Sequence, residues 1–485
     1  MTRSEVFDYL IRGAEVVDGT GAPRYEADIA IAGGRIARIG DLSGARAREE
    51  IDARGLTATP GFIDAHTHDD RAMLSDGDMA PKVSQGVTTV IGGNCGISLA
   101  PMPQPARAPV PPLDLLDAGG QWFRYARFAD YLDALRAQPA ATNCAMLVGH
   151  TTLRVIEMDD VGRPARAAEI ARMRARVDEA LQEGAIGVST GLAYAPSAAA
   201  TTEEVIEVCR PLSGRQGLYC THMRDEGDSV MASLEETFRI GRELGVPVVI
   251  SHHKVVGAAN RGRSAQTLAR IREQMGRQPV CLDCYPYNAS STILSHDLVD
   301  GAARVIVTWS KAMPQFAGRD LDEVARELGC PLAQAVDRLQ PAGAIYFRMD
   351  EEDVRRILRF DETMIGSDGL SHDEKPHPRL WGTFPRVLGH YGRGLGLFAL
   401  EQAVHKMTGL TAARFGLAGR GELREGAHAD VVLLDAGEVA DRATFAQPVA
   451  PSIGIHAVWT NGQPVWREGR STGARPGQVL RRVPR

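Results

Sequence analysis

The chain has 485 residues, of which 44% are hydrophobic and 24% charged, and a formal net charge of −6. These values are ordinary for a folded protein with one large domain and a smaller one. The mild acidity gives no reason to expect a nucleic acid or an anionic membrane as a partner. No apolar signal region opens the chain, and no segment is apolar for long enough to span a bilayer. Seven scattered cysteines, an odd number, favour reduced thiols and a cytoplasmic location.

Both ends of the chain contain short apolar segments separated by glycine-containing turns. Such segments indicate β-strands. We expect one small β-sandwich that is assembled from residues 1–60 and residues 416–485. The expected strands are Tyr9–Arg12, Glu15–Asp18, Asp28–Ala32, Arg35–Gly40, Ala429–Leu434, His456–Asn461 and Pro464–Arg467.

The middle of the chain, residues 61–415, alternates predicted strands with amphipathic helices. Residues 165–183 have apolar side chains at helical spacing, for example, and residues 185–189 follow as a strand. This α/β alternation predicts a parallel sheet, and we expect a (β/α)8 TIM-type barrel with its active site at the carboxyl ends of the strands. Residues from about 288 to 340 exceed an ordinary βα loop, so we interpret them as an insertion over the barrel mouth.

The segment Gly61–Asp70 contains an apolar strand that ends in His66-x-His68. Side chains two positions apart on a strand lie on the same face, so these two imidazoles can converge on one point. Two converging imidazoles are a large part of a metal site. The alternative is a chance pair in a polar loop, which further ligand-type residues at later strand ends make less favourable.

Those further residues stand where other apolar segments end. They are Cys95 after residues 87–93, His222 after 218–221, His252 and His253 after 248–251, and Asp368 after 364–367. Thiolate, imidazole and carboxylate ligands together suit a catalytic zinc site. Taken alone, Cys95 is typical of a small buried hydrophobe, and Asp368 of a turn. Adjacent histidines in an extended segment face opposite ways, so at most one of that pair would bind metal.

Longer motifs around these positions resemble those of the D-aminoacylases, the N-acyl-D-amino acid deacylases of the amidohydrolase superfamily. The likeness covers nearly the whole chain. The resembling segments are Gly61–His68, Asn94–Ser98, Gly149–Arg154, Thr221–Arg224, Ser251–Lys254, Gly366–Gly369 and Pro376–Gly382. The resemblance implies a zinc-dependent enzyme that hydrolyses the amide bond of small N-acyl-D-amino acids.

The resemblance also implies a set of metal ligands. One tight zinc would be held by Cys95, His222 and His252. A second, weaker metal position would be bordered by His66, His68 and Asp368. When bound, zinc would activate water and polarise the amide carbonyl. Asp368 would take the proton from that water and pass it to the leaving amine.

One feature of the sequence bears on this ligand set independently. Many amidohydrolases bridge two metals with a carboxylated lysine on the fourth barrel strand. This chain has no lysine between Lys82 and Lys254, so that bridge is unavailable. A thiolate from Cys95 in its place is what the resemblance implies.

Substrate binding requires cations, because an N-acyl amino acid carries an α-carboxylate. By the resemblance, Lys254, Tyr285 and Arg379 bind this group.

The pocket for the substrate side chain differs from that of broad-specificity relatives. Arg348 and Asp300 stand where apolar residues are expected, Ala193 stands where an aromatic residue is expected, and Tyr346 belongs to the same pocket by the resemblance. Arg348 could meet an acidic substrate side chain, which favours D-glutamate or D-aspartate derivatives. Alternatively it could pair with Asp300, which favours neutral derivatives of the D-leucine or D-methionine type.

Two other functions compete with this interpretation. A cyclic-amide hydrolase is disfavoured by the missing bridging lysine. A non-catalytic assembly protein on the same scaffold is disfavoured because such proteins lose ligands, whereas every expected ligand is present here.

Overall fold

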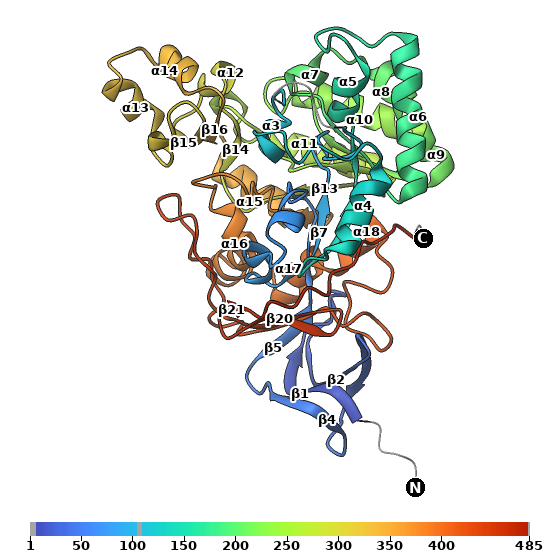
Figure 1. Ribbon diagram of the computed structural model, residues 1–485. Coiled ribbons are helices and arrows are strands. Elements are labelled where there is room, and N and C mark those ends of the chain that lie inside the picture. Colours follow the sequence, from blue (N-terminus) through green and yellow to red (C-terminus); the bar gives the residue numbers. More distant parts are fainter. Residues whose placement is uncertain (1–5, 104–108, 484–485) are drawn as a thin grey trace.

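Strands from both ends of the chain form one nine-stranded sheet, seen in Figure 1 as dark blue and red strands below the rest of the molecule. The structure is a computed structural model that describes residues 6–103 and 109–483. The sheet order is β21-β20-β19-β18-β5-β1-β2-β3, with β4 paired to β1. Its strands are β1 (Val6–Val16), β2 (Tyr25–Ala32), β3 (Arg35–Gly40), β4 (Arg46–Asp52), β5 (Thr57–Pro60), β18 (Val431–Leu434), β19 (Ile455–Thr460), β20 (Gln463–Arg467) and β21 (Arg470–Ser471).

The N-terminal strands differ from the predicted ones in two ways. The expected break between Tyr9–Arg12 and Glu15–Asp18 is a register shift inside the continuous strand β1, between Ile11 and Ala14. Gly13 lies there at φ +64°, which glycine adopts at low cost, so it bulges the strand instead of ending it. Strand β4 is absent from the predicted set because its mostly exposed sequence, RAREEID, has no apolar alternation.

The middle of the chain contributes parallel strands that alternate with helices. They form a three-stranded sheet, β6-β7-β8, and a six-stranded sheet, β17-β13-β12-β11-β10-β9. These strands are β6 (Phe62–Asp64), β7 (Val87–Gly92), β8 (Asn143–Met146), β9 (Val148–Gly149), β10 (Gly187–Gly191), β11 (Leu218–His222), β12 (Val248–Ile250), β13 (Val280–Cys284) and β17 (Thr363–Ile365).

The helices around these strands include the three that the α/β alternation predicts over residues 165–183, 231–244 and 264–275, with starts shifted by no more than two residues. These are α6 (Ala167–Glu183), α10 (Val230–Leu244) and α11 (Ser264–Met275). The others are α1 (Ala72–Ser75), α2 (Ala80–Val83), α3 (Asp114–Asp117), α4 (Phe128–Ala137), α5 (His150–Glu157), α7 (Ala195–Ala198), α8 (Thr202–Cys209), α9 (Pro211–Arg215), α15 (Glu351–Arg359), α16 (Arg379–Arg386), α17 (Leu400–Met407) and α18 (Gly409–Phe415), with a 3-10 turn at Ala258–Asn260 and a π-helix at Val387–Gly394. Within the described residues, no helix combines the length and hydrophobicity that crossing a bilayer requires.

Two apolar clusters pack on opposite sides of the parallel strands. The larger one lies between strands and helices and includes Val188, Phe238 and Cys284. The other contains residues from, or directly beside, each parallel strand: Ile63, Ala65, Ile91, Ala145, Leu147, Ile186, Leu218, Cys220, Val249, Cys281 and Met364. Cys281 and Cys284 therefore face opposite sides of β13, and all seven cysteines are unpaired.

The insertion forms a unit of its own, drawn in gold at the upper left of Figure 1. Its antiparallel sheet has the order β14-β16-β15, with β14 (Ala289–Ile293), β15 (Val305–Ser310) and β16 (Ala342–Phe347). Helices α12 (His296–Val299), α13 (Leu321–Glu327) and α14 (Leu332–Leu339) accompany the sheet. Because β16 belongs to this sheet, the insertion continues beyond residue 340.

The last described residues leave the terminal sheet and follow β8. Val479 forms a parallel bridge with Cys144, and the Leu480 N–H donates to the Cys144 carbonyl at 2.7 Å. The expectation that residues 416–485 all belong to a β-sandwich is therefore wrong for this tail, because its backbone pairs with a strand of the middle region.

A buried ion-pair network joins β6 to the loop after β17. Lys82 Nζ lies 2.8 Å from Asp64 Oδ2 and 3.1 Å from Asp69 Oδ2, and it donates to Ser367 Oγ at 2.8 Å. Burial opposes the charge of Lys82, but Asp64 and Asp69 outweigh this effect and raise its pKa. The Ser367 N–H donates to Asp64 Oδ1 at 2.7 Å, so one lysine and one aspartate hold both chain segments.

We expect Lys82→Met to destabilise the fold by about 3–5 kcal/mol, because it leaves two buried carboxylates without their cation. The measurement is the free energy of unfolding in urea at neutral pH. The exposed Lys375 provides the matched control, and Lys375→Met should leave that free energy nearly unchanged. Equal effects of the two substitutions would contradict the structural role given to Lys82.

Candidate metal centre and substrate cavity

All six residues of the expected ligand set lie at or just beyond the carboxyl end of a parallel strand. His66 and His68 follow β6, Cys95 follows β7, His222 ends β11, His252 follows β12 and Asp368 follows β17. Parallel strands present these ends at one edge, so residues far apart in the sequence converge there.

The first group of ligand atoms comes from Cys95, His222 and His252, and these atoms lie within 4.8 Å of one another. Cys95 Sγ lies 3.3 Å from His252 Nε2, and His252 Nε2 lies 3.1 Å from His222 Nδ1. Tetrahedral zinc with one sulfur and two nitrogen ligands would separate its donor atoms by roughly 3.3–3.6 Å. The donor types and spacing therefore fit zinc.

The second group consists of His66, His68, Cys95 and Asp368, whose ligand atoms also lie within 4.8 Å of one another. Asp368 Oδ1 lies 3.2 Å from His68 Nε2 and 3.5 Å from His66 Nε2. Cys95 Sγ lies 3.3 Å from His66 Nε2. Cys95 thus belongs to both groups, and its thiolate stands between the two potential metal positions.

Three of these residues have a left-handed backbone conformation. Cys95 has φ +53°, His252 has φ +37° and Asp368 has φ +51°. Such angles cost free energy for residues other than glycine and are tolerated where surrounding contacts enforce them. The Asp368 N–H, for example, donates to the His66 carbonyl at 2.8 Å, which ties one side of the second group to the other.

The buried charges of the site favour ionised ligands. Burial raises the pKa of the Cys95 thiol, but the charges of His66 and His252 outweigh it and hold this pKa well below its usual range. Burial likewise raises the pKa of Asp368, yet the guanidinium of Arg379 and the hydrogen bond from His68 hold it well below its usual range. Thiolate and carboxylate are the forms that bind metal.

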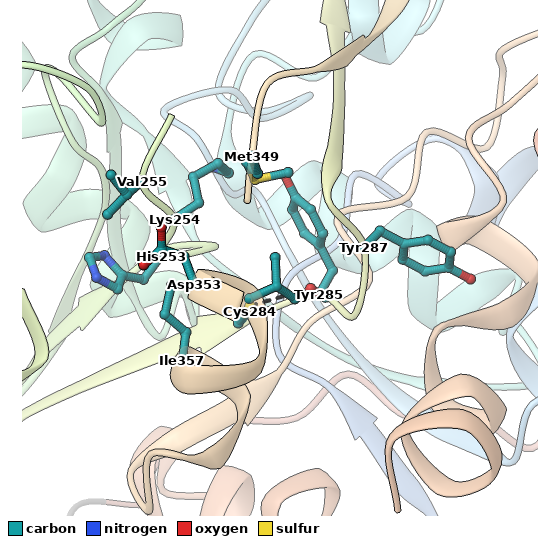
Figure 2. Close-up of a pocket in the computed structure, with 10 residues that line it drawn as sticks. His253, Lys254, Val255, Cys284, Tyr285, Tyr287, Met349, Asp353 and Ile357 are labelled. Atoms are coloured by element: carbon teal, nitrogen blue, oxygen red, sulfur yellow. Dashed lines mark hydrogen bonds between the residues drawn. The ribbon is translucent and has the colours of Figure 1, made fainter. Parts of the chain in front are cut away.

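His253 turns away from the ligands, in line with the expectation that one of the two adjacent histidines would do so. Its Nε2 lies 2.9 Å from Thr267 Oγ1 of α11. Figure 2 shows its ring pointing away from Tyr285, beside a cavity of about 10 Å³ that is too small for a substrate.

A larger cavity of about 240 Å³ opens beside the ligands. His68, His222, His252 and Asp368 form part of its wall, and residues of β14, of α12 and of the segment between them form the insertion side. The insertion residues that line it are Ser290, Ser291, Thr292, Ile293, Ser295, Asp297 and Leu298.

Two of the three residues expected to bind the α-carboxylate line this cavity, namely Lys254 and Tyr285. Lys254 Nζ lies 5.7 Å from the centre of the Tyr285 ring. The buried Tyr285 hydroxyl has no hydrogen-bond partner among the described residues, so it is free to donate to a ligand.

Arg379 is placed differently from this expectation. It is fully buried behind the wall, its Nη1 lies 2.8 Å from Asp368 Oδ2, and its guanidinium stacks 4.6 Å from the Tyr285 ring centre. It therefore contacts Asp368 directly, whereas the cavity wall is formed by other residues.

Only two of the four residues expected in the pocket for the substrate side chain line the cavity. Ala193 and Arg348 line the cavity. Asp300 is exposed and lies outside the lining, because α12 ends just before it and turns it to solvent. Tyr346 is buried in the insertion core, where its hydroxyl donates to the Ile293 carbonyl at 2.8 Å. The expectation that Asp300 and Tyr346 belong to the pocket is therefore not met, and no contact between described residues supports the alternative in which Arg348 pairs with Asp300.

Three further residues contact the ligands and escaped the sequence analysis. Asp283 accepts the N–H of His252 at 2.8 Å and lies 3.5 Å from His66 Nδ1. Tyr194 packs against His222 with ring centres 5.0 Å apart, and Glu226 lies 3.2 Å from His252 Nδ1. The sequence offered one signal for Asp283 as a site residue, namely a charged side chain inside the buried strand β13. For Glu226 it offered only the spacing of four residues from His222.

Comparisons with known proteins agree with this geometry. An amidohydrolase family model matches residues 49–273 and 300–466. The D-aminoacylase of Alcaligenes xylosoxydans xylosoxydans is 61% identical over 481 residues, which cover 99% of both chains. The N-acyl-D-aspartate deacylase of the same organism is 55% identical over 98% of this chain and 95% of its own.

Solved structures give the same result. A D-aminoacylase with a binuclear metal centre superposes with a TM-score of 0.96 and 59% identity, over 98% of this chain and 100% of its own. The N-acyl-D-glutamate deacylase of Bordetella bronchiseptica, complexed with zinc and a phosphonate mimic of the tetrahedral intermediate, superposes with a TM-score of 0.95 and 46% identity, over 98% and 100% of the two chains. The protein described here therefore belongs to the D-aminoacylase family of the amidohydrolases.

Proposed function

We propose that this protein hydrolyses the amide bond of N-acyl-D-amino acids with zinc held by Cys95, His222 and His252. The observation that carries this proposal is the convergence of these donor atoms at the wall of a cavity that Lys254 and Tyr285 also line. The relatives that act on N-acyl-D-amino acids are similar over the whole chain. A second, weaker metal position would lie at His66, His68 and Asp368, with Cys95 shared between the two.

When bound, zinc would activate water and polarise the scissile carbonyl. Asp368 is the group that accepts the proton from this water, because it is ionised and its Oδ2 is held by Arg379 at 2.8 Å. As this proton leaves, the oxygen of the water forms a bond to the carbonyl carbon, and the protonated Asp368 then donates to the nitrogen of the leaving amine as the C–N bond breaks. The products are a carboxylate and a free D-amino acid.

The α-carboxylate of the substrate would bind at Lys254 and Tyr285. The ammonium of Lys254 supplies charge, and the unpartnered hydroxyl of Tyr285 supplies a hydrogen bond. Arg379 would support substrate binding indirectly. It lies behind the cavity wall, where it stacks on the Tyr285 ring and keeps Asp368 in place.

We further infer that the parallel strands close into a (β/α)8 barrel. Strands β8 and β9 are separated only by Leu147, whose N–H donates to the Gly92 carbonyl at 3.0 Å. Strands β6 and β17 approach each other where the Ala65 N–H donates to the Ile365 carbonyl at 3.1 Å. The apolar cluster drawn from all parallel strands supports a filled barrel interior.

We infer three structural units in the chain. The barrel would occupy residues 61–415, interrupted by the insertion from about 288 to 347. A β-sandwich would combine residues 6–60 with residues from 416 to about 473. The separate apolar clusters around Trp459 and around Leu10 support two faces in that sandwich.

For the substrate side chain, we propose a preference for acidic D-amino acids. The half-buried guanidinium of Arg348 lines the cavity and makes no ion pair or hydrogen bond with any described side chain. Asp297 lines the same cavity but is more exposed, so water screens its charge more strongly. A carboxylate on the substrate is therefore the natural partner of Arg348.

Cys95→Ala should abolish tight zinc binding and activity together, because it removes a ligand common to both groups. Zinc content after dialysis and hydrolysis of an N-acetyl-D-amino acid library are the measurements. Cys209→Ala, at a buried cysteine of α8, is the matched control and should retain both. Full zinc content in Cys95→Ala would overturn the ligand assignment.

Asp368→Asn should lower turnover by about 10²–10⁴-fold, since the amide keeps the shape but accepts no proton. Tight zinc should remain bound, because its ligands are Cys95, His222 and His252. Single-turnover rates and zinc analysis of the same preparation provide the test. Near-normal turnover with zinc bound would move the acid–base role to another group.

Arg348→Met should erase the preference for N-acetyl-D-glutamate or N-acetyl-D-aspartate over N-acetyl-D-methionine, with a loss of about 2 kcal/mol in discrimination. The ratio of kcat/KM values on one acidic and one apolar substrate measures this change. Arg326→Met, on the outer helix α13, serves as the control. A wild-type preference for the apolar substrate would refute the acidic assignment.

A further inference from the structure

Glu226 is a buried carboxylate beside the metal ligands to which the proposed mechanism assigns no role. It follows the end of β11 by four residues, its side chain is 12% exposed, and it lines the substrate cavity. Several of its neighbours belong either to the zinc ligands or to the substrate-binding residues.

The carboxylate of Glu226 faces the outer nitrogens of two zinc ligands. His252 has its Nε2 among the ligand atoms, and its other nitrogen, Nδ1, lies 3.2 Å from Glu226 Oε1. His222 is oriented the opposite way, with Nδ1 towards the ligands and Nε2 at 3.8 Å from Glu226 Oε2. One side chain therefore stands behind both imidazoles.

The position of the proton on His252 determines which neighbour can accept its hydrogen bond. When Nε2 binds a metal, the proton of the neutral imidazole is on Nδ1, and this N–H needs an acceptor. Lys254 Nζ lies closer, at 2.7 Å, but an ammonium only donates. Glu226 Oε1, 3.2 Å from His252 Nδ1, is the carboxylate oxygen placed to accept this N–H, and it already accepts a hydrogen bond from Lys254 Nζ at 2.8 Å.

The same oxygen also holds the cation of the substrate site. Lys254 Nζ donates to Glu226 Oε1 at 2.8 Å. Lysine has a flexible stem, so a fixed partner reduces the cost of orienting its ammonium towards a ligand. Loss of the carboxylate would release Lys254 and place two donors, the ammonium and the His252 N–H, against each other.

We propose that Glu226 is a positioning residue that orients the zinc ligands His252 and His222 and, through the same carboxylate, the substrate-binding Lys254. This inference rests on the proposed zinc-dependent deacylase function. It predicts that one substitution weakens both zinc binding and substrate binding, although Glu226 touches neither the metal nor the scissile bond.

The test compares Glu226→Gln with wild type in two measurements on the purified enzyme. The zinc dissociation constant, from competition with a chelator in the absence of substrate, should rise about 10–100-fold. The KM for the best N-acetyl-D-amino acid, measured with saturating zinc, should rise as well. Lys254→Met should raise KM but leave zinc affinity unchanged, and adding Glu226→Gln to it should raise KM little further.

Glu236→Gln is the matched control. Glu236 pairs with Arg224 at 2.8 Å and is 14% exposed, so the substitution removes a carboxylate of similar burial. It should change neither zinc affinity nor KM. Should Glu226→Gln fail to fold, Glu226→Asp keeps the charge, shortens the reach and should weaken zinc binding in the folded protein.

Wild-type zinc affinity in folded Glu226→Gln or Glu226→Asp would overturn the positioning role. So would a rise in KM that simply adds to that of Lys254→Met. Absence of zinc binding or deacylation in the wild-type enzyme is a different result, since it would refute the proposed function itself.

Discussion

The shared thiolate of Cys95 is the constraint on which the rest of the site depends. Its sulfur lies 3.3 Å from the Nε2 atoms of both His66 and His252, so it connects a potential ligand that follows β6 with one that follows β12. A buried thiolate is stable only among compensating positive charges or metal. The histidines supply that environment for Cys95, and Arg379 together with His68 keeps Asp368 ionised.

Holding these groups together requires support from outside the ligand set. Asp283 accepts a hydrogen bond from the backbone N–H of His252 and lies beside the imidazole ring of His66. It therefore links the two groups of potential ligands. Lys82 joins β6 to the loop that carries Asp368, by a network of buried charges. Such contacts allow ligand residues to keep left-handed backbone angles that would otherwise be costly.

The insertion forms one wall of the cavity beside the potential metal ligands. Its strand β14 brings hydroxyl side chains to the cavity wall, and the segment after β16 brings Arg348. The sequence predicted an insertion but not the path of its chain, since register and turn geometry decide which residues face inward. This is why Arg348 lines the cavity whereas Tyr346 packs in the insertion core and Asp300 faces solvent.

The sequence by itself determined the alternation of strands and helices, the position of the long helices and the six ligand-type residues at strand ends, because apolar periodicity and residue chemistry are local properties. Only the tertiary structure decided that β4 joins the terminal sheet, that Arg379 pairs with Asp368, and that Asp283 and Glu226 stand behind the ligands. Those facts depend on distances between segments far apart in the chain. A carboxylate behind a histidine has no signature in sequence, because its role is defined by the neighbour that folding places beside it.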